Sequence, residues 1–188
     1  MKTKLFISAL IALALGCNLS CDTNSDTNYK HIKEFETSLE TWKRLKLEHG
    51  TSYTYEMSSG SVFGFGSTTK ITVENNIVVS RTFESYSIYD ETHNYLGYEN
   101  RWITSSYTET LETIGTHDNG ASPLTIDELY NTCLNDYLSV DTHTNQVTFS
   151  VDDFNLIKDC YYVANGCQDD CSIGIMITKF DWLEELNY

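Results

Sequence analysis

The spacing of apolar residues predicts an amphipathic helix near the start of the folded part of the chain. Over residues 32–49 the apolar side chains recur every three or four positions, which is the period of a helix with one buried side. These side chains are Phe35, Leu39, Trp42 and Leu45. Charged residues occupy the opposite side, and Gly50 stands where a C-terminal cap is expected. We therefore expect this helix to pack on another element by its apolar side.

A second helix is predicted after the turn Asp118-Asn119-Gly120. Thr125 precedes Glu128 by three residues, which is the spacing of a capping box at a helix N-terminus. The apolar residues that follow fall on one helical face. They are Ile126, Leu129, Tyr130, Cys133, Leu134 and Tyr137.

The other segments alternate apolar and polar residues, as half-buried strands do. Strands are predicted from Tyr53 and then over 70–74, 77–89, 101–114, 146–151, 155–163 and 172–180. Within each group of strands no helix intervenes, so the strands are expected to pair antiparallel. The order of helix, strands, helix and strands predicts an α+β fold. We expect a mostly antiparallel, curved sheet of about six to seven strands with two amphipathic helices on one face.

Size and charge narrow the class of protein. The chain has 188 residues, of which 40% are hydrophobic and 21% charged, as in a soluble globular protein with a single domain. The formal net charge of −15 repels phosphate backbones. Nucleic-acid binding is therefore excluded.

The N-terminus has the pattern of a secretory signal peptide. Lys2 and Lys4 precede the apolar run of residues 5–16, which is too short to span a bilayer. Ala14-Leu15-Gly16-Cys17 looks like a bacterial lipoprotein box, which predicts cleavage of residues 1–16 and lipidation of Cys17.

Two other fates of the leader stay open. Cys21 is the alternative lipidation site, because a polar segment follows it. Ordinary cleavage without a lipid is also compatible with the small residues Ala14 and Gly16. All three fates export the protein from the cytoplasm. Residues 17–28 then read as a polar tether and 29–188 as a single α+β domain.

The cysteines of the domain predict disulfides. Cys133, Cys160, Cys167 and Cys171 form an even set, which in an oxidising compartment indicates two bonds with three possible pairings. The preferred pairing joins Cys133 to Cys160 and Cys167 to Cys171. A zinc site is disfavoured, because these cysteines include no CxxC pair and have no nearby histidine.

Two features carry candidate chemistry. If a disulfide closes Cys167-Gln168-Asp169-Asp170-Cys171, the carboxylates of Asp169 and Asp170 are held close together and suit calcium, although a polar turn without metal explains the same residues. Phe63 and Phe65 stand in a glycine–serine loop over 58–67, as in many binding loops, unless both rings pack over the sheet edge. The five histidines are scattered, and no catalytic residue is predicted.

Short segments in a fixed order also carry a family likeness. They are Trp42, Tyr53-Thr54-Tyr55, Thr69-Lys70-Ile71-Thr72-Val73, Val78-Val79-Ser80, Leu124-Thr125-Ile126-Asp127-Glu128-Leu129-Tyr130, the cysteines Cys160, Cys167 and Cys171, and the C-terminal pattern of Ile175, Ile177, Thr178, Phe180, Trp182 and Leu183. In this order the chain resembles a family of small bacterial lipoproteins and secreted proteins that carry a domain of unknown function. The resemblance implies location in the cell envelope and the fold, and no chemistry.

The expected function follows from location and composition. We expect a lipid-anchored or freely secreted extracytoplasmic protein that acts as a non-enzymatic binding or structural module. Its partner is expected in the envelope or the extracellular space, and contact with the membrane only through an N-terminal lipid. The alternative is an extracytoplasmic hydrolase that uses carboxylates, with or without calcium.

Overall fold

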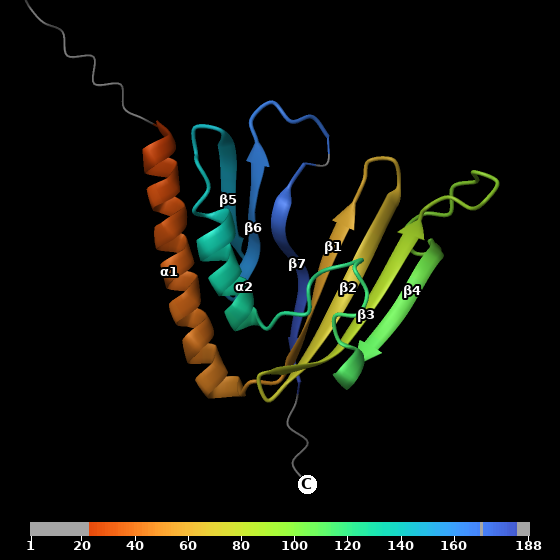
Figure 1. Ribbon diagram of the computed structural model, residues 1–188, viewed down its shortest axis with the longest axis horizontal. Helices are drawn as coiled ribbons and strands as arrows, with labels where there is room; N and C mark the ends of the chain where they lie inside the picture. Colours follow the sequence, from red (N-terminus) through yellow and green to blue (C-terminus); the bar gives the residue numbers. More distant parts are fainter. Residues whose placement is uncertain (1–22, 170, 184–188) are drawn as a thin grey trace, which may run out of the picture.

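The computed structural model describes residues 23–169 and 171–183. It contains one seven-stranded antiparallel sheet in the order β4-β3-β2-β1-β7-β6-β5 (Figure 1), and it confirms the predicted α+β class. The signal peptide predicted at 1–16 and the lipidation sites Cys17 and Cys21 lie outside the described residues.

The strands follow the predicted alternation closely. Their bounds are β1 (Tyr53–Gly60), β2 (Phe65–Glu74), β3 (Ile77–Ser87), β4 (Trp102–Thr110), β5 (Asn145–Val151), β6 (Ile157–Ala164) and β7 (Ile173–Trp182). The predicted loop over 58–67 is shorter than expected, because Ser59 and Gly60 pair with Ser67 and Gly66 in the β1–β2 hairpin. The predicted strand at 101–114 ends at Thr110, where the chain turns into the short 3₁₀ helix η1 (Leu111–Thr113).

The first helix is longer than the sequence pattern predicts. Helix α1 spans Thr23–His49, so it begins inside the segment expected to be a polar tether. The packed C-terminal part supplies the nucleus, and each further turn then adds hydrogen bonds at little extra cost. The spacing of apolar residues indicates only the part of a helix that packs on the core. For this reason the predicted helix starts later than the observed one.

The second helix confirms the predicted cap. Helix α2 spans Ile126–Thr132 and continues into the wider π-helical turn η2 (Cys133–Tyr137). The backbone N–H of Glu128 donates to Thr125 Oγ1 at 3.3 Å, and the N–H of Thr125 donates to Glu128 Oε2 at 2.7 Å. These two bonds satisfy donors that a helix N-terminus otherwise leaves free.

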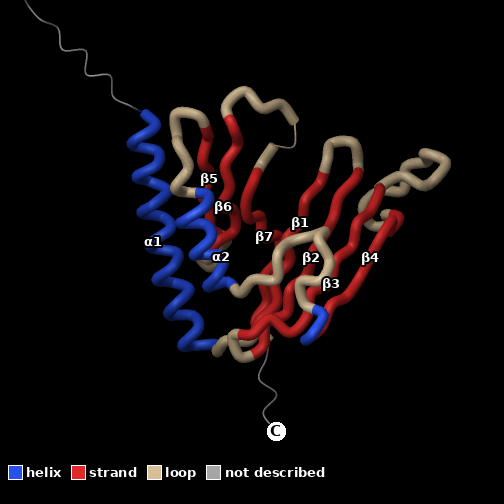
Figure 2. Tube along the Cα trace, in the orientation of Figure 1, coloured by secondary structure: helices blue, strands red, loops and turns tan. Residues whose placement is uncertain are grey.

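Both helices cover one face of the sheet, and the core lies between them and the strands (Figures 1 and 2). Trp42 of α1 is fully buried against Tyr53 of β1 and Trp182 of β7, with ring centroids 5.2 Å and 5.5 Å away. Phe35 of α1 packs edge-on against Tyr130 of α2. The aromatic side chains therefore tie α1 to the middle of the sheet and to α2.

Both predicted disulfides are present. Cys133 bonds Cys160, which joins η2 to β6, and Cys167 bonds Cys171 within the β6–β7 loop. The preferred pairing is confirmed. The first bond is fully buried in the core.

Candidate functional site

Exposed apolar side chains gather at one end of the sheet, which we call the loop end. It comprises the β1–β2 turn (61–64), the β3–β4 loop (88–101), the described part of the β6–β7 loop (165–169 and 171–172) and the strand residues next to them (Figure 1, top). Among the residues whose exposure the structure describes, 13 large hydrophobic residues are exposed, and eight of them belong to the loop end. They are Val62, Phe63, Phe65, Tyr95, Tyr98, Trp102, Ile103 and Ile173. Clusters of this kind are typical of interaction surfaces.

The two phenylalanines that the sequence singled out lie at this end. The side chain of Phe63 is 71% exposed and that of Phe65 is 58% exposed. The alternative in which both rings pack over the sheet edge is therefore wrong. Their role in binding stays a prediction.

The β1–β2 turn is fixed against the neighbouring loop. Gly64 has a φ of +84°, and a Cβ there would lie 2.5 Å from Ile88 Cγ1, so only glycine fits this contact. The carbonyl of Gly64 accepts a hydrogen bond from the Ile88 N–H at 2.9 Å. The aromatic residues of the turn are thus presented from a fixed backbone.

A carboxylate organises the β3–β4 loop. The Asn94 side chain and backbone N–H and the Thr92 hydroxyl donate to Asp90, and these hydrogen bonds lower the pKa of the exposed Asp90 carboxyl to about 2. The negative charge of Asp90 is thus stabilised by donors of the same loop. Asp90 therefore shapes the loop and is not available as a proton carrier near neutral pH.

Arg101 holds the base of the same loop on the sheet. Its guanidinium lies 5.3 Å from the ring centroid of Tyr86 and 4.8 Å from that of Tyr98, and 3.5 Å from the Glu84 carboxylate. Such cation–π contacts fix the planes of both rings. Sequence reasoning missed this cluster, because its members become neighbours only when the loop folds back.

The sheet is split at the loop end. Pairing between β1 and β7 ends at Met57 and Ile177, and beyond this point β1 pairs only with β2 and β7 only with β6. We call the resulting gap the cleft. Its cavity has a volume of about 530 Å³. Its lining is mostly small and polar: Ser58, Ser59, Gly60, Ser61, Phe65, Gly66, Ser67, Ser172 and Met176.

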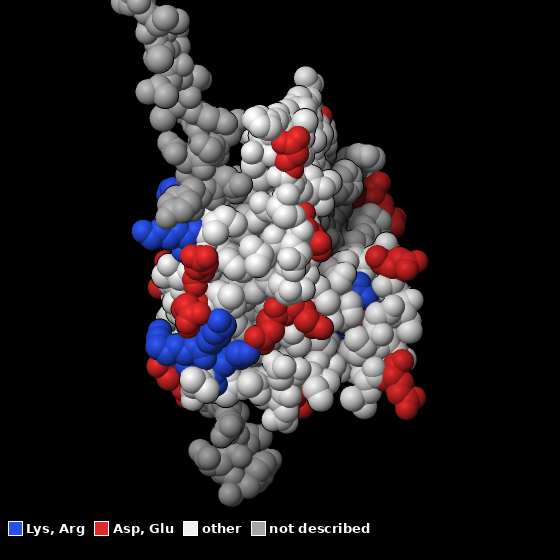
Figure 3. Space-filling view, turned by 60° about the vertical axis from the view of Figure 1, so that its left-hand side comes forward, with Lys and Arg blue, Asp and Glu red and all other residues white. Residues whose placement is uncertain are grey.

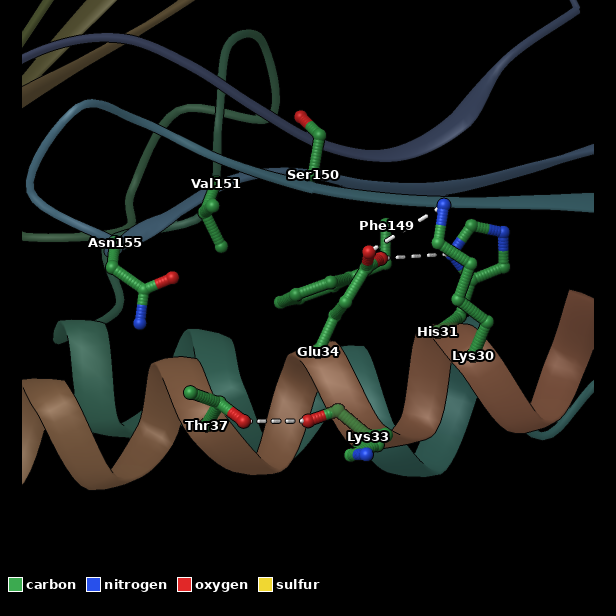
Figure 4. Close-up of a pocket in the computed structure, with 9 residues that line it drawn as sticks. All are labelled: Lys30, His31, Lys33, Glu34, Thr37, Phe149, Ser150, Val151 and Asn155. Atoms are coloured by element: carbon green, nitrogen blue, oxygen red, sulfur yellow. Dashed lines mark hydrogen bonds and ion pairs between the residues drawn. The ribbon is translucent and has the colours of Figure 1, made fainter.

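A second hollow lies between α1 and β5 (Figure 4). Its cavity of about 590 Å³ is lined by the Phe149 ring and by charged side chains of α1. The Glu34 carboxylate lies between Lys30 Nζ and His31 Nδ1, at 3.6 Å and 3.7 Å. Glu34 thus offsets the positive charge of Lys30 in this hollow.

The most deeply buried polar cluster lies away from the loop end. Arg81 of β3 and Glu109 of β4 are 2% and 0% exposed, and Arg81 Nη1 donates to Glu109 Oε2 at 3.2 Å. The same guanidinium donates to the carbonyls of His117 and Asn119. We call residues 114–120 the strap, because these contacts fasten it to the sheet.

Hydrogen bonds set the charge state of Glu109. Burial by itself would raise the pKa of this carboxyl, but the backbone N–H groups of Gly115 and His117 each donate to it at 2.7 Å. Together with the His117 ring and Arg81 they lower the pKa to about 2. Both oxygens of Glu109 are thus occupied by the strap and by Arg81, which is the pattern of a structural ion pair.

The predicted calcium site is only partly described. Asp169 is exposed and has a φ of +70°, and Asp170 lies outside the described residues. Within the described residues there is no group of three or more His, Cys, Asp or Glu side chains that could hold a metal ion. Calcium binding by Asp169 and Asp170 stays a prediction.

The α1 side of the molecule carries much of its basic charge (Figure 3). Helix α1 contributes Lys30, Lys33, Lys43, Arg44 and Lys46. Four of them form ion pairs with acidic neighbours, as Lys43 does with Glu40 at 2.9 Å and Lys46 with Asp127 at 2.6 Å. Among the residues that the structure describes, no helix is long and apolar enough to cross a membrane.

No protein-family model, no curated protein and no solved structure matches this chain. The likeness to bacterial lipoproteins and secreted proteins stays a prediction from the sequence segments. Function is therefore inferred from the chemistry of the chain's own residues.

Proposed function

We propose that this protein is a non-enzymatic binding module of the cell envelope or the extracellular space, and that the loop end contacts its partner. The observation that carries the proposal is the exposure of Phe63 in the β1–β2 turn and of Phe65 next to it, where a contact between Gly64 and Ile88 fixes the backbone. Aromatic side chains on a rigid support gain contact area at low entropic cost when they bind.

The compartment is supported by the cysteines. Two disulfides, one of them buried, form in an oxidising environment such as a periplasm or an extracellular space. The lipoprotein pattern adds an N-terminal lipid on Cys17, or alternatively on Cys21.

Intact mass spectrometry of the native protein tests the anchor. A lipid-modified Cys17 or Cys21 together with two disulfides is the expected result. An unmodified N-terminus at Cys17 with a third disulfide would show a freely secreted protein and contradict the anchor.

Photo-crosslinking in the native envelope tests the binding surface. A photoreactive phenylalanine analogue at position 63 is expected to give a discrete adduct that disappears with Phe65→Ser. The matched control places the same analogue at Phe154, which is 72% exposed and lies in the β5–β6 turn, away from the loop end. Equal adducts from both positions, or none from position 63, would contradict the proposal.

A stability measurement makes that experiment interpretable. Phe63→Ser combined with Phe65→Ser is expected to change the free energy of unfolding by less than about 0.5 kcal/mol, because both rings are mostly exposed. A large loss in urea unfolding would mean that the rings support the core.

A further inference from the structure

We propose that the cleft between β1 and β7 binds an extended polypeptide segment as an added β-strand. The inference deepens the proposed binding function, since it names the class of partner and the way in which it is held. It is carried by backbone groups that the sheet leaves unpaired on both walls of the cleft.

The first wall is the end of β1. Residues Ser58 to Gly60 pair with β2 alone, and the Ser61 N–H donates to the Phe65 carbonyl at 2.8 Å. In an antiparallel pair, residues bonded to one neighbour alternate with residues that face the other way. Counting back from Ser61, the backbone groups of Ser58 and Gly60 face away from β2. Met57 and Ile177 form a pair without hydrogen bonds of their own, so the Ser58 N–H beside it is directed at the Met176 carbonyl as the last bond of the ladder. The Ser58 C=O and both backbone groups of Gly60 then face into the cleft.

The lower part of the same strand agrees with this count. The Leu183 N–H donates to the Ser52 carbonyl at 3.1 Å, so the even-numbered residues of β1 are those that face β7. Below the split β7 supplies their partners. Above the split no described strand does.

The second wall is the start of β7. Residues Ile173 to Met176 pair with β6 alone, which leaves their other edge toward β1 (Figure 1). A bulge marks the split, and here Thr178 Oγ1 donates to the Glu56 carbonyl at 3.3 Å and lies 3.2 Å from Ser58 Oγ. Side-chain hydroxyls thus end the ladder at the vertex of the cleft.

The chemistry of the walls selects the occupant. Unpaired backbone donors and acceptors on two facing edges are complementary to a main chain, and proteins normally protect such edges from other strands. The serines and glycines of the lining leave space for a backbone, while Phe65 and Met176 offer apolar contacts beside it. The complementary partner is an extended, uncharged segment with apolar side chains.

Both walls are held in place before binding. Cys160 of β6 pairs with Ile175 in the ladder and is bonded to Cys133 in η2, which anchors the β7 side to the helices. On the other side, β1 belongs to the four-stranded part of the sheet formed with β2, β3 and β4. A preformed cleft avoids much of the ordering cost of binding.

The test uses a phage-displayed library of random dodecamer peptides against the full mature chain with both disulfides intact. Peptides enriched on the wild type are then added to ¹⁵N-labelled protein. We expect hydrogen–deuterium exchange of the Gly60 amide to become at least tenfold slower, while the amides of Ser59 and Ser61, which already face β2, keep their rates.

The matching variant is Gly60→Pro, which removes one cleft-facing N–H at a strand edge without a β7 partner, where proline is tolerated. A Cβ at Gly60 has no neighbour nearer than 3.8 Å. We expect it to weaken peptide binding at least tenfold. If this variant does not fold, the amide exchange of the wild type alone decides.

Several outcomes would overturn the inference: no enriched peptide, unchanged exchange at Gly60, full affinity in folded Gly60→Pro, or a second copy of the chain filling the cleft as a concentration-dependent dimer. The double variant Phe63→Ser with Phe65→Ser separates the two proposals. If peptide binding requires both rings but the cleft amides stay unprotected, only the proposal of strand addition is contradicted. If the peptide still protects the cleft amide from exchange in the double variant, only the proposed role of the rings is contradicted.

Discussion

At the scale of single residues, the buried Glu109 carboxylate holds the strap by accepting hydrogen bonds from its backbone and by pairing with Arg81. Removing its charge leaves Arg81 buried beside a neutral partner. We expect Glu109→Gln to lower the free energy of unfolding by about 3–5 kcal/mol, the usual cost of breaking a buried ion pair. Urea unfolding measures it, and the exposed Glu91→Gln serves as the control with a change below about 0.5 kcal/mol. Equal effects of the two substitutions would contradict this account of the strap.

The Glu109 carboxylate also makes the free energy of unfolding depend on pH in the acidic range. The pKa of Glu109 is about 2 in the folded protein, below its ordinary value of 4.5, so its ionised form favours folding above pH 4.5. This contribution is lost as the pH falls from about 4.5 to about 2. Asp90, with a pKa of about 2 as well, adds to the loss in nearly the same range. We therefore expect Glu109→Gln to flatten, but not abolish, the fall in unfolding free energy over this range. An unchanged slope would show that Glu109 is not the titrating group.

Two paired glycines differ in the space around them. At Gly66 a Cβ would collide with the Tyr86 hydroxyl and lie 2.8 Å from the Ser59 carbonyl, whereas at Gly60 the nearest atom, the Phe65 carbonyl oxygen, is 3.8 Å away. We expect Gly66→Ala to cost about 1–3 kcal/mol through overpacking, and Gly60→Ala to be neutral or slightly stabilising. Thermal unfolding of both variants tests the difference, and a reversed order would mean that the Tyr86 ring moves aside freely.

At the scale of elements, the spacing of apolar residues predicted nearly all helices and strands, but it placed several of their first or last residues wrongly. The capping box of Thr125 and Glu128 was predicted correctly because it depends on two residues three apart. The start of α1 was missed because helix propagation beyond the packed part leaves no apolar signal. The loop over 58–67 was overestimated because serine and glycine are common in loops, although here they pair as strand residues.

The two disulfides should contribute unequally to stability. Their sequence separations are 27 and 4 residues, and closing the longer loop removes more entropy from the unfolded chain. We expect replacement of Cys133 and Cys160 by alanine to cost about 3.5 kcal/mol and replacement of Cys167 and Cys171 about 2 kcal/mol. Urea unfolding of the two double variants decides the order. A larger loss for the 167–171 bond would mean that it stabilises the native loop directly.

At the scale of the whole molecule, one seam joins the two parts of the sheet. Below the cleft, β1 and β7 are held together by backbone pairing and by the ring of Trp42, which lies against Tyr53 and Trp182. We expect Trp42→Ala to lower the unfolding free energy by about 3–5 kcal/mol, whereas Leu47→Ala on the same helix, at a side chain 90% exposed, changes it by less than about 0.5 kcal/mol. Chemical unfolding followed by circular dichroism measures both, and similar losses would show that the seam is held by the backbone alone.

The sequence by itself determined the fold class, the capping box and the set of cysteines that form disulfides, whereas the exposure of Phe63 and Phe65 came from the structure. Each of the first three features depends on residue type or on the spacing of nearby residues, so a short segment of the sequence is enough to predict it. Only the tertiary structure decided that β1 and β7 part beyond Met57 and Ile177, that Arg101 contacts both Tyr86 and Tyr98, and that Arg81 meets Glu109 beneath the strap. These contacts join residues from different strands and loops, and strand register fixes them. No local pattern reports register, because it is set by how the whole sheet packs.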